Sequence, residues 1–133
     1  MLGTSRDSLN SLISSLTETS IDDSVIETCR QLFDVCTILD DDKALRSAIA
    51  DSGQTSASRE SLMSDLFASK VSPLCLKVLT TVAANRWSSE RDVIEALEEL
   101  AARLLFKASL KKNELDSVEQ ELFRIARLVQ TNS

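Results

Sequence analysis

The 133 residues carry 21 acidic and 15 basic side chains, a net charge of -6 at neutral pH, and 43% of them are hydrophobic. This composition is typical of a folded globular chain, and its acidic surplus argues against a nucleic-acid or anionic-membrane surface. Two glycines, one proline and no tyrosine favour helices, and the length suffices for one compact core without metal or disulfide.

Four helices are expected before residue 70. Thr4 and Ser20 each precede an aspartate by three residues, a spacing typical of a capped helix start. The run 40–42, three aspartates, is interpreted as helix capping rather than a cation site, because the glycine turn of a calcium loop is absent. The apolar positions that define these helices are Leu9, Leu12, Ile13 and Leu16; Val25, Cys29, Leu32, Cys36 and Leu39; Leu45, Ala48 and Ile49; and Leu62, Met63, Leu66 and Phe67.

The segment 71–105 predicts an antiparallel helix pair around which the other helices pack. Ser72 followed by Pro73 is a strong start signal for the first helix, and Ser89 with an aspartate three residues later opens the second. Trp87, in the corner between them, is expected to close the end of a bundle, with an interface anchor as the alternative. The first helix carries two apolar stripes: Leu76, Leu79 and Ala83, and Leu74, Val78 and Val82. We therefore expect it to be covered on more than one side.

The tail after residue 105 leaves two interpretations open. No glycine or proline follows Ser88, so the last helix can run on, or Asn113 with an aspartate three residues later can cap a new helix. Apolar residues alternate there at spacings of three and four: Leu115, Val118, Leu122, Ile125 and Val129. We expect this stripe either to fold back on the bundle or to drive self-association through 113–131.

An internal repeat is suggested by comparing the two ends at an offset of 93 residues. Residues 23–25 (DSV) then match residues 116–118 (DSV), and the apolar positions that follow share one register. We interpret residues 1–110 as one six-helix unit and residues 111–133 as the helix that begins a truncated second repeat. On this interpretation the sequence is a fragment of a longer protein.

Catalysis and metal binding find no support in the residue types present. The three cysteines, Cys29, Cys36 and Cys75, lie on apolar helix faces and are expected to be core. Histidine is absent, and neither a nucleophile elbow nor a phosphate-binding glycine loop occurs. We therefore expect no enzyme, no cofactor and no metal. The first residues lack a signal peptide and no apolar run approaches a membrane span, so a soluble cytoplasmic protein is expected.

Two segments carry a resemblance to a known family. RWSSERDVIEALEELA, followed by DSVEQELFRIARLV, resembles the delta subunit of actinobacterial F-type ATP synthases, and SRDSL and KVSPLCLKVL fit the same family. The resemblance covers essentially the whole chain and implies an all-α fold, a six-helix N-terminal delta-type bundle with a long C-terminal helical extension. It implies a non-catalytic connector of the peripheral stalk, or stator, that links the catalytic head to the stalk for proton-driven ATP synthesis.

The resemblance also implies partners. In the family, an amphipathic helix from the N-terminus of the alpha subunit lies in a groove between the first and fifth helices, and the stalk b subunit is reached through a C-terminal domain that this chain lacks. The matching positions are Leu9, Leu12, Ile13, Leu16, Leu76, Leu79, Val82 and Ala83. Whether this copy or a second repeat binds alpha stays open, and so does the alternative that both stripes of the fifth helix are core. The expected location is peripheral, within a complex on the cytoplasmic side of the plasma membrane, without membrane insertion. The alternative function is a regulatory helix-binding adaptor unrelated to the synthase.

Overall fold

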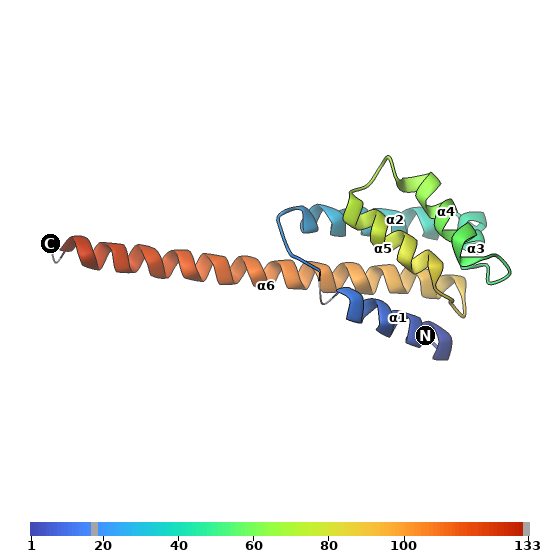
Figure 1. The fold of residues 1–133 in the computed structure, drawn as a ribbon, viewed down its shortest axis with the longest axis horizontal. Helices are drawn as coiled ribbons and strands as arrows, with labels where there is room; N and C mark the ends of the chain where they lie inside the picture. The colour runs from blue at the N-terminus through green and yellow to red at the C-terminus, as the bar shows by residue number, and fades with distance from the viewer. Residues whose placement is uncertain (17–18, 132–133) are drawn as a thin grey trace.

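A computed structural model describes residues 1–16 and 19–131, and every regular element within them is an α-helix. In chain order the helices are α1 (Gly3–Leu16), α2 (Ser24–Asp41), α3 (Lys43–Ala50), α4 (Ser56–Phe67), α5 (Pro73–Ala84) and α6 (Glu90–Thr131). Five shorter helices gather around one end of α6, whose other end projects far beyond them (Figure 1). This confirms the expected all-α fold, a six-helix bundle with a long C-terminal helical extension.

Side-chain caps set the start of α3, α4, α5 and α6; in α4 the Oγ1 of Thr55 accepts the backbone N–H of Ser58 at 3.0 Å. Ser72 Oγ accepts the backbone N–H three residues later at 3.1 Å, and Pro73 occupies the first turn of α5, as the sequence predicts. Ser89 Oγ does the same for α6 at 3.3 Å, and the Asp42 carboxylate for α3 at 3.0 Å. Helix capping is therefore the role of at least one aspartate in the 40–42 run.

Two other predicted caps are wrong. Thr4 lies inside α1, which already begins at Gly3, so its hydroxyl does not occupy the cap position. Ser20 lies four residues before the start of α2. The carboxylate of Asp22 instead accepts the backbone N–H of Ser24 at 2.8 Å, because an aspartate just before a helix can reach the exposed amides of its first turn.

The bundle is assembled on the N-terminal half of α6. Helices α1, α2, α3 and α5 all pack against it, and its most extensive contact is with α2, whereas α5 packs chiefly on α4. We expected α5 and α6 to form the central pair. This is wrong, because the main neighbour of α6 is α2 and not α5. The buried residues that α6 contributes to this core are Val93, Ile94, Ala96, Leu97, Leu100, Ala101, Leu104 and Ala108.

A buried arginine joins α4 to the end of α5. Arg59 is 4% exposed, and its guanidinium donates to the carbonyl of Ala83 at 2.8 Å, of Gln54 at 2.6 Å and of Asp51 at 3.1 Å. The last carbonyls of a helix have no partner within the helix, so a side chain with several N–H groups satisfies them well. Arg59 thereby fixes the C-terminus of α5 and the α3–α4 loop to one another.

The corner between α5 and α6 is closed by Trp87, as expected. The indole is 6% exposed, and its Nε1–H donates to the carbonyl of Val82 at 2.8 Å. The large ring therefore covers the end of the core while its one polar group is satisfied. This confirms the structural role over the interface anchor.

The extension is a continuation of α6 and not a separate helix. Asn113 lies inside an unbroken helix from Glu90 to Thr131, so the predicted new cap is wrong. No breaker interrupts the sequence there, and helix propagation costs less than starting a new nucleus. Residues 109–130 are exposed, and the helix points away from the bundle (Figure 1), so the stripe of Leu115 to Val129 does not fold back. No described helix has the length and apolar character needed to cross a membrane.

Replacing Arg59 with alanine should destabilise the bundle, because several buried carbonyls lose a charged donor at once. We expect the free energy of unfolding to fall by about 2–4 kcal/mol. Arg30→Ala is the matched control, since Arg30 is an exposed helical arginine paired only with Glu27, and it should change stability by less than about 1 kcal/mol. Urea unfolding followed by circular dichroism measures both. Equal losses in the two variants would contradict the role assigned to Arg59.

Candidate functional site

A narrow apolar groove lies between α1 and α5, with α6 as its floor. Leu12 and Leu16 form the α1 wall, Leu74 and Val78 form the α5 wall, and Leu100 of α6 lies at the bottom. Its volume is about 60 Å³. Lys77 is the one charged residue that lines it. The arrangement suits apolar side chains from an extended or helical partner laid along the groove.

Six of the eight expected binding residues lie in this groove or in the core, and Ile13 and Leu76 lie elsewhere. Leu79, Val82 and Ala83 are fully buried, and Leu9 is 5% exposed, so these four side chains are held within the bundle. Of the eight expected residues, the two that line the groove are Leu12 and Leu16. Leu76 is half-buried on another face of α5. Their role in binding a partner stays a prediction.

The α5 wall comes from the second stripe of that helix. Leu74 and Val78 were grouped with Val82 on one stripe, separate from the stripe of Leu76, Leu79 and Ala83. The resemblance implies Leu76, Leu79 and Ala83 of the other stripe together with Val82, whereas the structure puts Leu74 and Val78 beside α1. The floor that Leu100 provides depends on how three helices meet, which periodicity along one helix does not show.

A second apolar groove lies on the other side of α1, against α6. Its volume is about 360 Å³, and the exposed apolar side chains that line it are Phe106 and Leu110 from α6, opposite Ile13 and Leu16 from α1. Leu16 therefore contributes to both grooves. The C-terminal half of α1 therefore separates the two apolar grooves.

Hydrogen bonds hold α1 at both of its ends. Ser5 Oγ accepts the backbone N–H of Ser88 at 2.6 Å, and Ser8 Oγ donates to the carbonyl of Arg86 at 2.8 Å, both in the α5–α6 corner. At the other end, Lys107 donates to the carbonyl of Leu16 at a longer 3.3 Å. Lys107 also donates to the carbonyl of Thr19 at 3.4 Å, so the start of α1 is tied to the α5–α6 corner and its end to α6.

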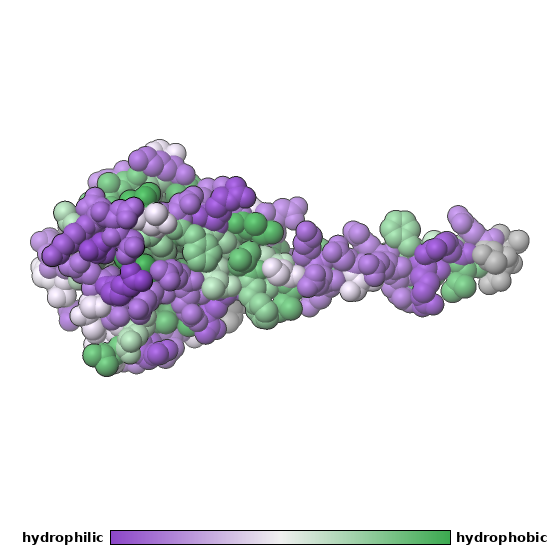
Figure 2. All heavy atoms as spheres, turned by 180° about the vertical axis from the view of Figure 1, so that it is seen from behind, coloured by the Kyte–Doolittle hydropathy of each residue, from purple (hydrophilic) through white to green (hydrophobic). Residues whose placement is uncertain are grey.

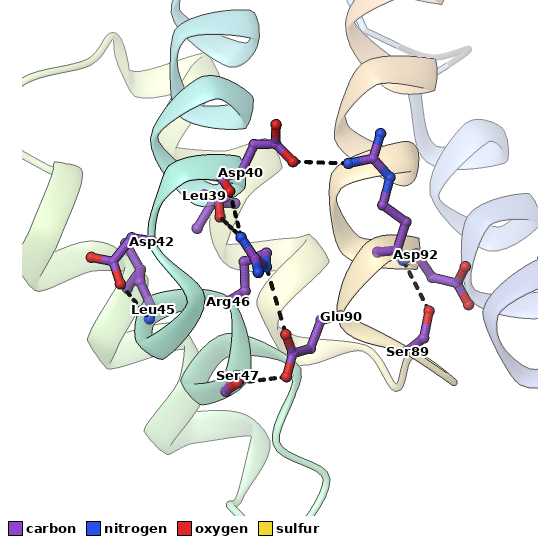
Figure 3. Close-up of polar contacts among 10 residues, drawn as sticks. Leu39, Asp40, Asp42, Leu45, Arg46, Ser47, Ser89, Glu90 and Asp92 are labelled. Atoms are coloured by element: carbon purple, nitrogen blue, oxygen red, sulfur yellow. Dashed lines mark hydrogen bonds and ion pairs between the residues drawn. The ribbon is translucent and has the colours of Figure 1, made fainter.

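A polar hollow of about 920 Å³ lies where α3 meets the start of α6. Its charges pair with one another: Arg91 with Asp40 at 2.9 Å and Arg46 with Glu90 at 3.6 Å (Figure 3). Ser47 also donates to Glu90 at 2.5 Å. Since these charges are already paired, the hollow is better explained as a structural link between α2, α3 and α6 than as a ligand site.

The three cysteines are free and buried, as the sequence predicts. Burial raises the pKa of the Cys36 thiol to about 12, and nearby Glu98 adds a smaller increase. Burial also raises the pKa of the Cys75 thiol to about 12, with a smaller increase from Cys29. The pKa of Cys29 is itself raised by burial. A protonated thiol is a poor nucleophile and a poor metal ligand. Within residues 1–16 and 19–131, no group of three or more acidic or cysteine side chains could hold a metal ion.

Comparison with curated proteins finds relatives that share one description, ATP synthase subunit delta. The one from Corynebacterium diphtheriae is 43% identical over 102 residues, which covers 77% of this chain and 37% of the relative. Those from Corynebacterium aurimucosum and Thermobifida fusca are 38% and 34% identical, and each match covers 97% of this chain and 49% or 48% of the relative. The chain thus spans less than half the length of these relatives. No protein-family model matches it.

The raised thiol pKa values predict a loss of stability in alkali. Between the ordinary thiol pKa of 9.0 and the folded value of about 12, the unfolded chain releases protons that the folded chain retains. The free energy of unfolding should therefore fall as the pH rises through this window. Unfolding at pH 8 and pH 10.5 measures the slope. The double variant Cys36→Ala/Cys75→Ala retains the lysines that titrate in the same range and should give a shallower slope. An unchanged slope would contradict the prediction.

Proposed function

The chain is homologous to actinobacterial ATP synthase delta subunits, and from this relationship we propose that it is a non-catalytic connector in the peripheral stalk of an F-type ATP synthase. The observation that carries the proposal is sequence identity of 34–38% along 97% of the chain. In this role the bundle links the catalytic head to the stator and resists the torque of the rotor.

We further propose that the groove between α1 and α5 receives the N-terminal helix of the alpha subunit. The apolar walls of Leu12, Leu16, Leu74 and Val78 support this, since a helix with apolar residues at i, i+3, i+4 and i+7 presents one such stripe. Lys77 at the groove adds a positive charge that favours an acidic residue on the partner helix.

Docking requires the groove to widen, because about 60 Å³ offers little room for side chains. We propose that the C-terminal half of α1 moves away from α5 while its N-terminal half stays fixed. The short hydrogen bonds of Ser5 and Ser8 to the α5–α6 corner support a fixed start. The apolar hollow behind Ile13 and Leu16 provides space into which the end of α1 can shift.

The remaining parts of the assignment follow from the same proposal. Residues 1–110 act as the delta-type bundle, and residues 111–133 are the start of a second repeat. The b subunit is reached through regions that the longer relatives have in addition. The location is peripheral, on the cytoplasmic side of the plasma membrane as part of the complex.

A single charge in the groove should abolish binding of the alpha helix. We expect Leu74→Glu to weaken binding of a synthetic peptide, the N-terminal segment of the Corynebacterium diphtheriae alpha subunit, by at least tenfold, or about 1.4 kcal/mol. Leu76→Glu is the matched control, since Leu76 is half-buried on the same helix but does not line the groove. Isothermal titration calorimetry measures both affinities.

An NMR titration of the labelled chain with the same peptide locates the site. We expect shifts at Leu12, Leu16, Leu74 and Val78. Equal weakening by Leu76→Glu would favour the wider set of residues expected from the sequence and contradict the narrower groove. Absence of binding at saturating peptide would contradict the docking proposal and assign the head contact to the second repeat, leaving this bundle as a spacer.

A further inference from the structure

Two lysines of α6 hold the end of α1 and the segment that follows it. The ammonium of Lys107 donates to the carbonyl of Leu16 at 3.3 Å and of Thr19 at 3.4 Å. The ammonium of Lys111 donates to the carbonyl of Ile21 at 2.6 Å. The two lysines are four residues apart on α6, so they reach this segment from the same face of the helix. We call Lys107 and Lys111 the clip.

The clip meets α1 at an end where apolar packing is incomplete. Leu9 and Leu12 are the buried apolar side chains of α1, and none of residues 13–16 is fully buried. Leu16 is the last residue of α1, so its carbonyl has no partner within the helix. A cation beside the C-terminus of a helix also interacts favourably with the helix dipole. The clip therefore supplies charged donors to the end of α1 that the core holds least.

The stems of both lysines lie along apolar surface. Figure 2 shows apolar atoms gathered where the projecting part of α6 leaves the bundle. Lys107 lines the groove between α1 and α6, and Lys111 lines a hollow at the start of α2. The apolar residues that share these two linings are Ile13, Leu16, Phe106 and Leu110 in the first, and Ile21, Ile26 and Leu115 in the second. Long cationic side chains cover such surface with their methylene groups while the ammonium reaches a polar partner.

We propose that the clip keeps the groove between α1 and α5 narrow, and that its release opens the groove to a partner helix. The inference rests on the proposed docking of a helix in that groove. Leu16 lines the groove while its carbonyl accepts from Lys107, so this wall moves away from α5 only if a bond already 3.3 Å long is stretched or lost. A partner that binds the open state alone has its apparent affinity reduced by the fraction of chains that are open.

Removing the clip should loosen the end of α1 without unfolding the bundle. In the double variant Lys107→Met/Lys111→Met, methionine retains an unbranched apolar stem and lacks the ammonium. We expect the backbone amides of residues 10–16 to exchange with solvent faster by about threefold or more, because the end of α1 opens locally. The amides of α2 and α5 should exchange as in the unmodified chain. Hydrogen exchange followed by NMR measures both sets.

The matched control is Lys70→Met/Lys112→Met, which removes the same number of charges from two exposed lysines. Within residues 1–16 and 19–131, neither of these ammonium groups makes a hydrogen bond or an ion pair. The control should leave the exchange of α1 unchanged. Equal acceleration in the two variants overturns the proposal. Acceleration throughout the bundle with a fall in melting temperature also overturns it, since that result indicates general destabilisation.

The second readout is the affinity for the synthetic N-terminal peptide of the Corynebacterium diphtheriae alpha subunit. General destabilisation would weaken binding, whereas release of the clip lowers the cost of opening and should tighten binding by about threefold or more. Isothermal titration calorimetry compares the unmodified chain with both double variants. Equal affinities for all three overturn the role of the clip and leave the docking proposal intact. Absence of binding to all three contradicts the docking proposal and, with it, control of docking by the clip.

Discussion

The bundle depends on one constraint, that a single face of α6 must be covered. Its buried residues from Val93 to Ala108 form a continuous apolar surface that α1, α2, α3 and α5 pack against together. Since α1 and α5 lie side by side on this helix, the space between them has an α6 residue, Leu100, as its floor. The candidate groove is thus a consequence of how two helices share a third, and its width depends on how firmly α1 is held.

Polar contacts then fix the positions of the packed helices. The guanidinium of Arg59 satisfies carbonyls from α5 and from the α3–α4 loop, so these segments cannot separate without leaving buried acceptors unpaired. Thr28 and Ser72 hydroxyls lie 2.7 Å apart and join α2 to the start of α5. The ion pairs in Figure 3 are more exposed and contribute orientation more than stability. Together these contacts hold α5, one wall of the groove, against α2 and α4.

Local signals in the sequence were sufficient for the fold but only partly so for the site. The caps at Ser72 and Ser89 depend on neighbouring residues alone, and the structure confirms both. A fully polar residue such as Asn113 resembles a cap, yet its effect is small beside the cost of nucleating a new helix. The burial of Arg59 could not be predicted, because its acceptors lie in segments distant in sequence. The same holds for Leu74 and Val78: periodicity finds an apolar stripe but does not say which helix lies opposite.

The unbroken length of α6 has a mechanical consequence. Its 42 residues span about 63 Å, and the bundle packs against the first half of the helix, through buried side chains up to Ala108. A sideways force on the exposed residues 109–130 therefore acts through a lever arm, and the bending moment is largest near Ala108, where the buried contacts end. Because there is no proline or glycine at that point, the helix has no built-in hinge to yield there. A force on the extension is therefore transmitted directly into the packed core.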